Sequence, residues 1–451
     1  MRRVKQLIFL VLLSLLIISG CSQRKNPLQM EIGNGGLFEN TFEFSSLENV
    51  LNDPVGRTLL VYLPPGYQEG IASNYKYPIL FLLHGFKENG RSYQHFYNIK
   101  TIADEMISTG EIQPMLIVMP DGSGRFGGSF FNNSVLPDGR NFGGKYEDYI
   151  TKELFDHVLY NYGKWMEGVT YTVEVDTIPI YRDSIVVDTT CKIDTTISDC
   201  PPESLVYDTT IYKIPYDTIL YDTTVFVSDS ISFQKNLGIS GHANGGYGAL
   251  RIATDYPLTF GSVSAMSAPL SFDSLLNLVP IFLHTYGIDT LPQRYHQIDL
   301  NNLDRLGCLF FAMAVAFSPH NPSDPDLSTF FQLTPSGLGV DLPFDSLGDT
   351  DTTVWNKWLI NDMKTRITNL PSSDTLVKKL KFYIDCGEQD EFGFDVQDSI
   401  FYNALLEKVP ASNITFETYS GYPGYPALNN SFIYDRLRKV LKFHSDCFTA
   451  P

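Results

Sequence analysis

Short apolar runs alternate with amphipathic stretches along most of the chain. Three early runs are bounded by proline or glycine: TLLVYL (58–63), YPILFLLHG (77–85) and MLIVMPDG (115–122). The last two are almost continuously apolar, which is typical of strands buried on both faces of a sheet. Further strand-like runs lie at 236–240, 261–266, 380–385 and 414–419, and helical patterns at 99–109, 147–161, 396–408 and 432–444. This alternation predicts an α/β fold, a mostly parallel, doubly wound sheet with helices on both faces.

The N-terminus has the pattern of an export signal. Residues 1–20 carry a basic start and a short apolar run from Leu7 to Ile18, and no hydrophobic stretch of about 18 residues, the length of a membrane span, follows. The next residues, Ile18-Ser19-Gly20-Cys21, resemble a bacterial lipobox, which implies that Cys21 is lipidated. We therefore expect an exported protein whose lipid at Cys21 anchors it to the cell envelope, at the outer membrane or the periplasmic face. The alternative is an ordinary secretory signal in which the cysteine is accidental.

Residues 21–50 are polar and predict a tether with a first edge element, and one later block also departs from the α/β rhythm. Residues 168–233 contain Asp-Thr six times without a fixed period, with eleven acidic and three basic residues. Because β-branched and aromatic residues are frequent there, the block predicts irregular β-hairpins projecting from the main domain. This acidic insert is either a spacer or an interaction surface.

Charge and cysteine content narrow the choice of partners. The chain has 33 Lys and Arg against 51 Asp and Glu, a net charge of −18, so a nucleic acid would be repelled.

Besides Cys21, five cysteines remain, and Cys191 and Cys200 are the candidate disulfide because they lie close together in the insert. The pairing of Cys308, Cys386 and Cys447 stays open. No Cys/His motif predicts a metal site.

Residues 236–250, NLGISGHANGGYGAL, read as a strand, a glycine-rich sharp turn and a helix. This is the context of a nucleophile elbow, in which the central side chain stands exposed above the sheet.

At this point the chain resembles the putative esterase family of α/β-hydrolases, which includes S-formylglutathione hydrolase and the feruloyl and acetyl-xylan esterases. The resemblance rests on YLPPGY (62–67), YPILFLLHGF (77–86), IVMPDGSGRFGGSFFNNS (117–134), KYEDYITKEL (145–154), GHANGGYGALR (241–251), FAMAVAFSP (311–319), DLPFD (341–345) and DCGEQDEF (385–392). It implies an α/β-hydrolase domain over 51–167 and 234–447, carboxylic-ester hydrolysis and no cofactor.

The departures from the family pattern concern the catalytic triad. Where the family has its nucleophilic serine, this chain has Ala243, whose methyl group cannot attack a carbonyl. The segment GEQD retains the acid position at Asp390, while Tyr422 aligns with the histidine position. No histidine lies between Asp390 and His444, and tyrosine, with a pKa near 10, is a poor base at neutral pH.

The resemblance also implies an oxyanion hole formed by the backbone amides of Phe86 and Asn244, which would survive side-chain replacement. Three alternative functions follow. The first is a non-catalytic pseudo-esterase that binds an ester-bearing, carbohydrate or protein ligand. The second is an active esterase with a displaced nucleophile near those amides, and the third is a surface interaction protein acting through 168–233. The oligomeric state stays open.

Overall fold

The computed structural model describes residues 35–162, 169–191, 205–228, 233–321, 328–371 and 374–449. Within these ranges the chain forms two compact units. One contains residues 169–227, and the other contains the chain before and after this segment. The signal at 1–20 and the lipidation site Cys21 lie outside the described residues.

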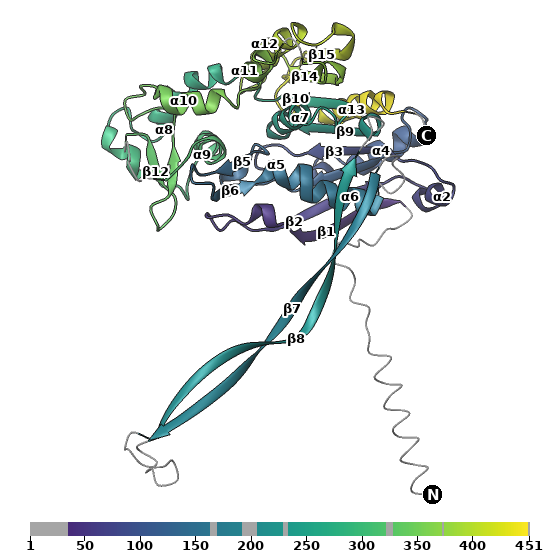
Figure 1. Cartoon of the computed structure of the whole chain (residues 1–451). Helices are drawn as coiled ribbons and strands as arrows, with labels where there is room; N and C mark the ends of the chain where they lie inside the picture. Colours follow the sequence, from purple (N-terminus) through teal and green to yellow (C-terminus); the bar gives the residue numbers. More distant parts are fainter. Residues whose placement is uncertain are drawn as a thin grey trace, which may run out of the picture. The chain divides into compact units, whose positions relative to one another are not determined.

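The larger unit is built on a single eight-stranded sheet (Figure 1). The strands at one edge pair antiparallel, in the order β1–β2–β4, and all further neighbours, β4–β3–β9–β10–β14–β15, pair in parallel. The predicted mostly parallel α/β sheet is confirmed. The strands are β1 (Gly36–Glu43), β2 (Gly56–Leu63), β3 (Ile79–Leu83), β4 (Leu116–Pro120), β9 (Leu237–His242), β10 (Ser262–Met266), β14 (Lys381–Gly387) and β15 (Ile414–Tyr419).

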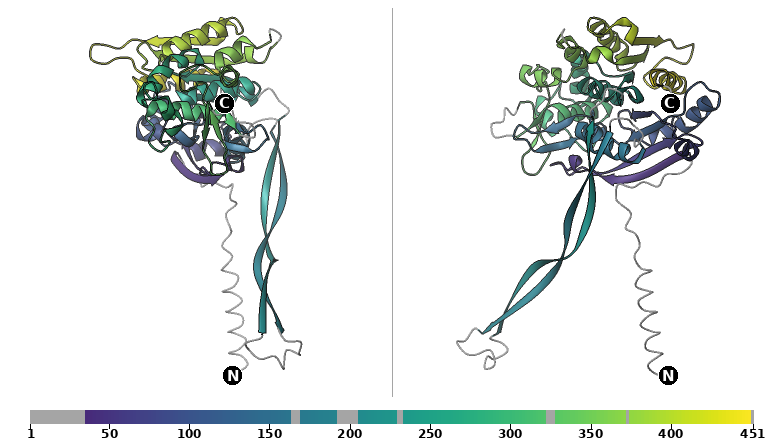
Figure 2. Two further views of the ribbon diagram at one scale, coloured as in Figure 1. Left: turned by 90° about the vertical axis from the view of Figure 1, so that its left-hand side faces the viewer. Right: turned by 45° about the vertical axis from the view of Figure 1, so that its right-hand side comes forward.

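Helices cover both faces of this sheet, as the continuous apolar strands require (Figure 2). Leu80 and Leu82 of β3 share one hydrophobic cluster with α4 (Ile99–Ser108) and α13 (Ile433–Cys447). The intervening Phe81 points to the other face, where its ring lies 6.0 Å from that of Phe155 in α6 (Leu154–Tyr162). The helix α7 (Asn244–Asp255) packs against β9 and β10.

The chain between β10 and β14 forms a separate layer of helices beside a small sheet. Its aromatic side chains pack on one another: the rings of Phe282, Phe310 and Phe344 lie 5.1–5.4 Å apart. The elements are α8 (Val279–Thr285), α9 (Arg305–Phe317), β11 (Pro319–His320), β12 (Phe330–Gln332), β13 (Gly339–Asp341), α10 (Thr352–Leu359) and α11 (Met363–Thr368). The remaining elements of the larger unit are α2 (Tyr67–Ala72), α3 (Ser92–His95), β5 (Asn133–Val135), β6 (Asn141–Lys145), α5 (Tyr146–Asp148), a π-helical turn (Tyr149–Glu153) and α12 (Phe394–Leu406).

The acidic insert differs from its prediction. Instead of several irregular hairpins, it forms one pair of long strands, β7 (Val169–Cys191) and β8 (Leu205–Ser228). Pro179 and Pro215 do not break these strands, because both members of a two-stranded sheet are edge strands, and an edge strand tolerates proline where its amide would face outward. Cys200 lies outside the described residues, so the predicted bridge from Cys191 falls outside them too.

The thiols of Cys308, Cys386 and Cys447 are free, and the first two are buried. Across the described ranges, every helix is too short or too polar to cross a membrane.

Candidate functional site

The turn between β9 and α7 has the geometry of a nucleophile elbow. Ala243 joins the two elements with φ 49° and ψ −115°, a conformation that side-chain-bearing residues rarely adopt and that costs about 1–3 kcal/mol. Its amide donates to the carbonyl of Met266 at the end of β10, at 2.8 Å. The strained turn predicted around residue 243 is therefore present, with a methyl group at its apex.

Glycines are required on both sides of Ala243 because the backbone is closely packed there. A Cβ at Gly241 would lie 2.1 Å from the carbonyl carbon of Gly245, and a Cβ at Gly245 would lie 2.1 Å from the carbonyl oxygen of Leu83. These are backbone contacts that no side-chain rotation can relieve. The glycines thus hold the start of α7 against the end of β3.

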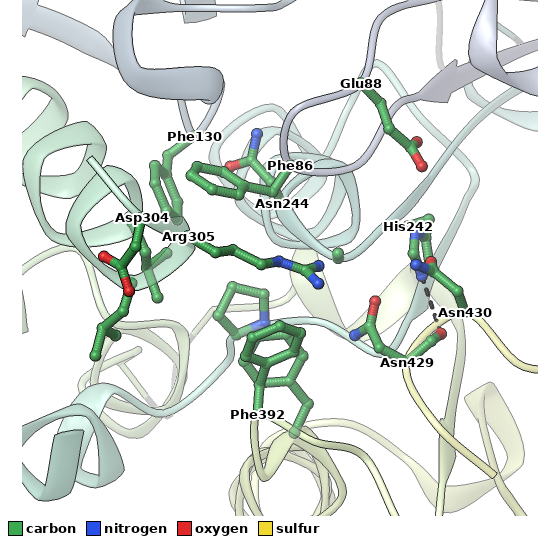
Figure 3. A pocket seen from close by; sticks show the side chains of 15 residues that line it. Phe86, Glu88, Phe130, His242, Asn244, Asp304, Arg305, Phe392, Asn429 and Asn430 are labelled. Carbon is green, nitrogen blue, oxygen red and sulfur yellow. Dashed lines mark hydrogen bonds between the residues drawn. The ribbon is translucent and has the colours of Figure 1, made fainter. Parts of the chain in front are cut away.

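Ala243 lies in a pocket of about 220 Å³ (Figure 3). The pocket collects side chains from segments that are distant in the sequence, among them the turn after β3, the elbow, the start of α9, the loop after β14 and the loop after β15. Its fifteen lining residues are Phe86, Glu88, Phe130, His242, Ala243, Asn244, Pro269, Asp304, Arg305, Leu306, Leu309, Phe392, Phe394, Asn429 and Asn430. Serine, threonine, cysteine, tyrosine and lysine are absent from this described lining.

The structure brings the two residues predicted for the oxyanion hole into this pocket. Phe86 follows β3, and Asn244 is the first residue of α7. Within the described chain, neither backbone amide has a hydrogen-bond partner. The side chain of Asn244 is 2% exposed, and neither its oxygen nor its nitrogen is hydrogen-bonded to a described residue. The elbow therefore offers unused polar groups to a ligand.

Asp390 lies in the loop after β14, as the sequence predicts. Its carboxylate accepts from the amide of Phe392 at 2.9 Å and from the Nδ2 of Asn429 at 3.0 Å. Burial raises the pKa of Asp390 above its usual value, and the hydrogen bonds oppose this rise.

Tyr422 does not take the position predicted for it. Its side chain is 56% exposed and absent from the pocket lining. Instead, Tyr422 pairs with Tyr425 in a tight turn, with the rings 4.9 Å apart. The chain returns to the pocket only after this turn, and it is the buried Asn429 that contacts Asp390. The sequence Ser-Gly-Tyr at 420–422 thus pointed to a residue at the start of the turn, whereas the residue that contacts Asp390 follows the turn.

The two histidines near the elbow are fully buried and differ in their hydrogen bonding. Both ring nitrogens of His84 contact backbone: Nδ1 lies 2.9 Å from the oxygen of Gly85, and Nε2 accepts from the amide of Gly122 at 2.9 Å. His242 donates from Nε2 to the carbonyl of Asn429 at 3.1 Å, and its Nδ1 has no partner among the described residues. Burial lowers the pKa of both rings, so both are neutral at pH 7.

Arg305, the first residue of α9, lines the pocket although no motif in the sequence marked it. Asn429 and Asn430 also line the pocket and were not predicted. They lie just before α13, and this short distance from the last helix was a usable signal.

Comparisons with known proteins identify a family for this chain. The model of the family described as "Putative esterase" matches residues 54–171 and 226–425. An endo-1,4-beta-xylanase/feruloyl esterase of Xylanibacter ruminicola is 32% identical over 93 residues, which are 20% of this chain and only 12% of that protein. A ferulic acid esterase structure covers 92% of this chain and all of its own, at 16% identity and a TM-score of 0.47. An S-formylglutathione hydrolase of Agrobacterium tumefaciens covers 93% and 98%, at 14% identity and a TM-score of 0.46.

Proposed function

Because the chain belongs to the putative esterase family and has its α/β-hydrolase fold, we propose that it binds a ligand in the pocket above Ala243 without hydrolysing it. The observation that carries this proposal is the elbow, which keeps its strained backbone and close glycine packing but presents a methyl group. A methyl group can neither attack a carbonyl nor be activated by a base.

The rest of the pocket supports the proposal. A displaced nucleophile would have to lie within reach of the amides of Phe86 and Asn244, yet the described lining holds no hydroxyl, thiol or amine. The group beside Asp390 is the amide of Asn429, which cannot accept a proton as imidazole does. In a serine protease, losing the nucleophile or the base alone costs about 10⁶-fold in rate.

The retained features suit an ester-bearing or glycan-like ligand. The amides at the elbow can accommodate a carbonyl or carboxylate oxygen, and the aromatic lining offers a surface for a ring. The family membership points to carboxylic esters as the ancestral ligands of this pocket.

The test is to rebuild the triad with the positions that the structure identifies. We expect no hydrolysis of short-chain aryl acetates by the unmodified protein or by Ala243→Ser, since no base activates the new hydroxyl. Ala243→Ser with Asn429→His places an imidazole beside Asp390 and should raise turnover about 10-fold or more above either. Initial rates of aryl-acetate cleavage measure the effect.

Ala243→Ser with Tyr422→His is the matched control and should stay inactive, because residue 422 lies outside the pocket. Circular dichroism of each variant checks that it is folded. Turnover by the unmodified protein would contradict the proposal and require a nucleophile elsewhere.

A second candidate function is an interaction through β7 and β8. The observation that favours it is their separation, as a compact unit, from the unit that carries the pocket. For both candidate functions, we propose that the protein is exported and anchored to the membrane by a lipid at Cys21. The lipobox-like sequence at residues 18–21 supports this proposal.

A further inference from the structure

The turn after β15 presents two tyrosines to solvent. All five residues of the sequence Tyr-Pro-Gly-Tyr-Pro at 422–426 are exposed, and the side chains of Tyr422 and Tyr425 are 56% and 63% exposed. Single exposed apolar residues are ordinary on a protein surface, but large aromatic side chains that are exposed side by side are typical of interaction sites.

This turn is held in one conformation by its own backbone. The amide of Tyr422 donates to the carbonyl of Tyr425 at 3.0 Å, and the amide of Tyr425 donates to the carbonyl of Tyr422 at 2.8 Å. A Cβ at Gly421 would lie 2.4 Å from the carbonyl oxygen of Tyr425, so the turn folds closely onto its own stem. Pro423 and Pro426 fix further backbone angles. Because the turn is already ordered, binding a partner here would cost little conformational entropy.

Two further rings support the exposed tyrosines. The ring of Phe432 lies 5.8 Å from that of Tyr422 and 5.8 Å from that of Tyr419. The guanidinium carbon of Arg436 lies 4.8 Å from the ring centre of Tyr419. Arg436 is 2% exposed and forms an ion pair with Asp385, so its charge is compensated inside the fold. The buried end of this aromatic cluster thus already packs against a guanidinium group.

Two glutamates of the loop after β14 lie beside the stem of the turn. Glu388 accepts from the hydroxyl of Ser420 at 2.5 Å, and its amide donates to the carbonyl of Tyr419 at 3.1 Å. Glu391 accepts from the amide of Asn429 at 2.9 Å. Both glutamates are exposed, and neither forms an ion pair with a described lysine, arginine or histidine. Their uncompensated charges attract cations.

Four side chains form what we call the acidic aromatic surface: Tyr422, Tyr425, Glu388 and Glu391. We infer that this surface binds an arginine-bearing segment of another protein. A guanidinium group packs on aromatic faces and forms paired hydrogen bonds with carboxylates, so a single residue type uses both features of the surface. The ammonium group of lysine is a compact point charge and lacks the planar shape that stacks on a ring.

The geometry and charge favour such a segment over a sugar. The rings of Tyr422 and Tyr425 pack on each other with a tilt of 39°, so they do not form one flat platform on which a sugar ring could stack. The net charge of −18 also attracts a basic partner from a distance. Neither tyrosine lines the pocket above Ala243, so this inference does not depend on the proposed binding function.

The experiment measures the binding of two fluorescein-labelled peptides of about ten residues, one alternating arginine and glycine and the other lysine and glycine. Fluorescence anisotropy is recorded at pH 7 and about 0.15 M salt, where exposed charges more than about 8 Å apart are screened. The arginine peptide should bind about 5-fold or more tightly than the lysine peptide, because only the guanidinium stacks on the tyrosines.

Two double variants separate the contribution of the rings from that of the charges. Tyr422→Ala with Tyr425→Ala should remove the preference for arginine, whereas Glu388→Gln with Glu391→Gln should weaken both peptides about 5-fold or more. Phe96→Ala is the matched control, since Phe96 is 72% exposed and its ring contacts Tyr97 instead. It should bind both peptides like the unmodified protein. Circular dichroism checks that each variant is folded.

Three results would overturn the inference. The first is equal or absent binding of the two peptides, and the second is an arginine-peptide affinity that neither double variant changes, which would assign the attraction to charge elsewhere on the chain. The third is binding of neutral cellohexaose that Tyr422→Ala with Tyr425→Ala abolishes while the arginine peptide binds as before, which would assign the surface to a glycan. All three leave the proposed function of the pocket untouched.

Discussion

At the residue scale, the elbow combines a strained backbone with a residue that carries only a methyl group. Ala243 lies between Gly241 and Gly245, where the backbone packs so closely that neither glycine has room for a Cβ. The strain is thus maintained by packing and needs no catalytic side chain.

Gly245→Ala tests how closely the backbone is packed at the elbow. The new Cβ would lie 2.1 Å from the carbonyl oxygen of Leu83, so we expect the free energy of unfolding to fall by about 3 kcal/mol or more. Gly56→Ala is the control, since its Cβ would meet only a methyl group of Thr41 at 3.8 Å. Urea unfolding measures both variants. Equal stability of the two would mean that β3 and α7 are farther apart than described.

The sequence indicated the site wherever its residues are close together in the chain. Ala243 and Asn244 belong to one short glycine motif, and Asp390 belongs to another, so the resemblance to the esterase family could locate them from short stretches of sequence. Asn429 is separated from Asp390 by a strand and the Tyr422–Tyr425 turn, whose path depends on tertiary contacts. Arg305 reaches the pocket because a whole helical layer packs there, and local spacing carries no information about such packing.

At the element scale, the apolar runs located several strands closely. The run at 414–419 coincides with β15, and the run at 58–63 lies within β2. By contrast, CLFFAMAVAF in α9 is apolar at every position, so periodicity cannot distinguish a buried helix from a buried strand. The insert shows the same limit, since β-propensity indicates strands but does not determine their length or pairing.

Replacing residues 169–228 by a short glycine-serine linker tests whether the insert and the pocket act separately. Because the two compact units are distinct, we expect the melting temperature of the larger unit to change by less than about 4 °C. The aryl-acetate turnover of Ala243→Ser with Asn429→His should also be unchanged when the insert is removed from that variant. Differential scanning calorimetry and initial rates measure these quantities. Loss of that turnover in a folded deletion variant would instead mean that the pocket depends on the insert.

At the scale of the whole molecule, several buried histidines couple stability to pH. Both ring nitrogens of His444 contact serine hydroxyls, of Ser262 at 2.7 Å and Ser264 at 2.9 Å. Burial lowers the pKa of His444 to about 3 and that of His157 to about 4. The half-buried Asp156, whose pKa is raised to about 6 by desolvation, acts in the opposite direction.

His444 should therefore destabilise the fold in acid. The unfolded chain binds a proton at this residue below about pH 6.5, while the folded chain does so only near pH 3. Between these values the free energy of unfolding falls by about 1.4 kcal/mol per pH unit for this group. His444→Gln should reduce the slope by about that amount between pH 6 and pH 4.5, measured by urea unfolding. Equal slopes for His444→Gln and the unmodified protein would contradict the assignment.

The place of the insert also matters for how the sheet assembles. Ile79 of β3 pairs with Leu237 of β9, so this pairing closes a loop of about 160 residues, of which the insert supplies about 60. Closure entropy grows only with the logarithm of loop length, at about 0.6 kcal/mol per doubling, so the insert adds about 0.4 kcal/mol. This segment can therefore be lengthened, exchanged or removed during evolution at almost no thermodynamic cost to the larger unit into which it is inserted.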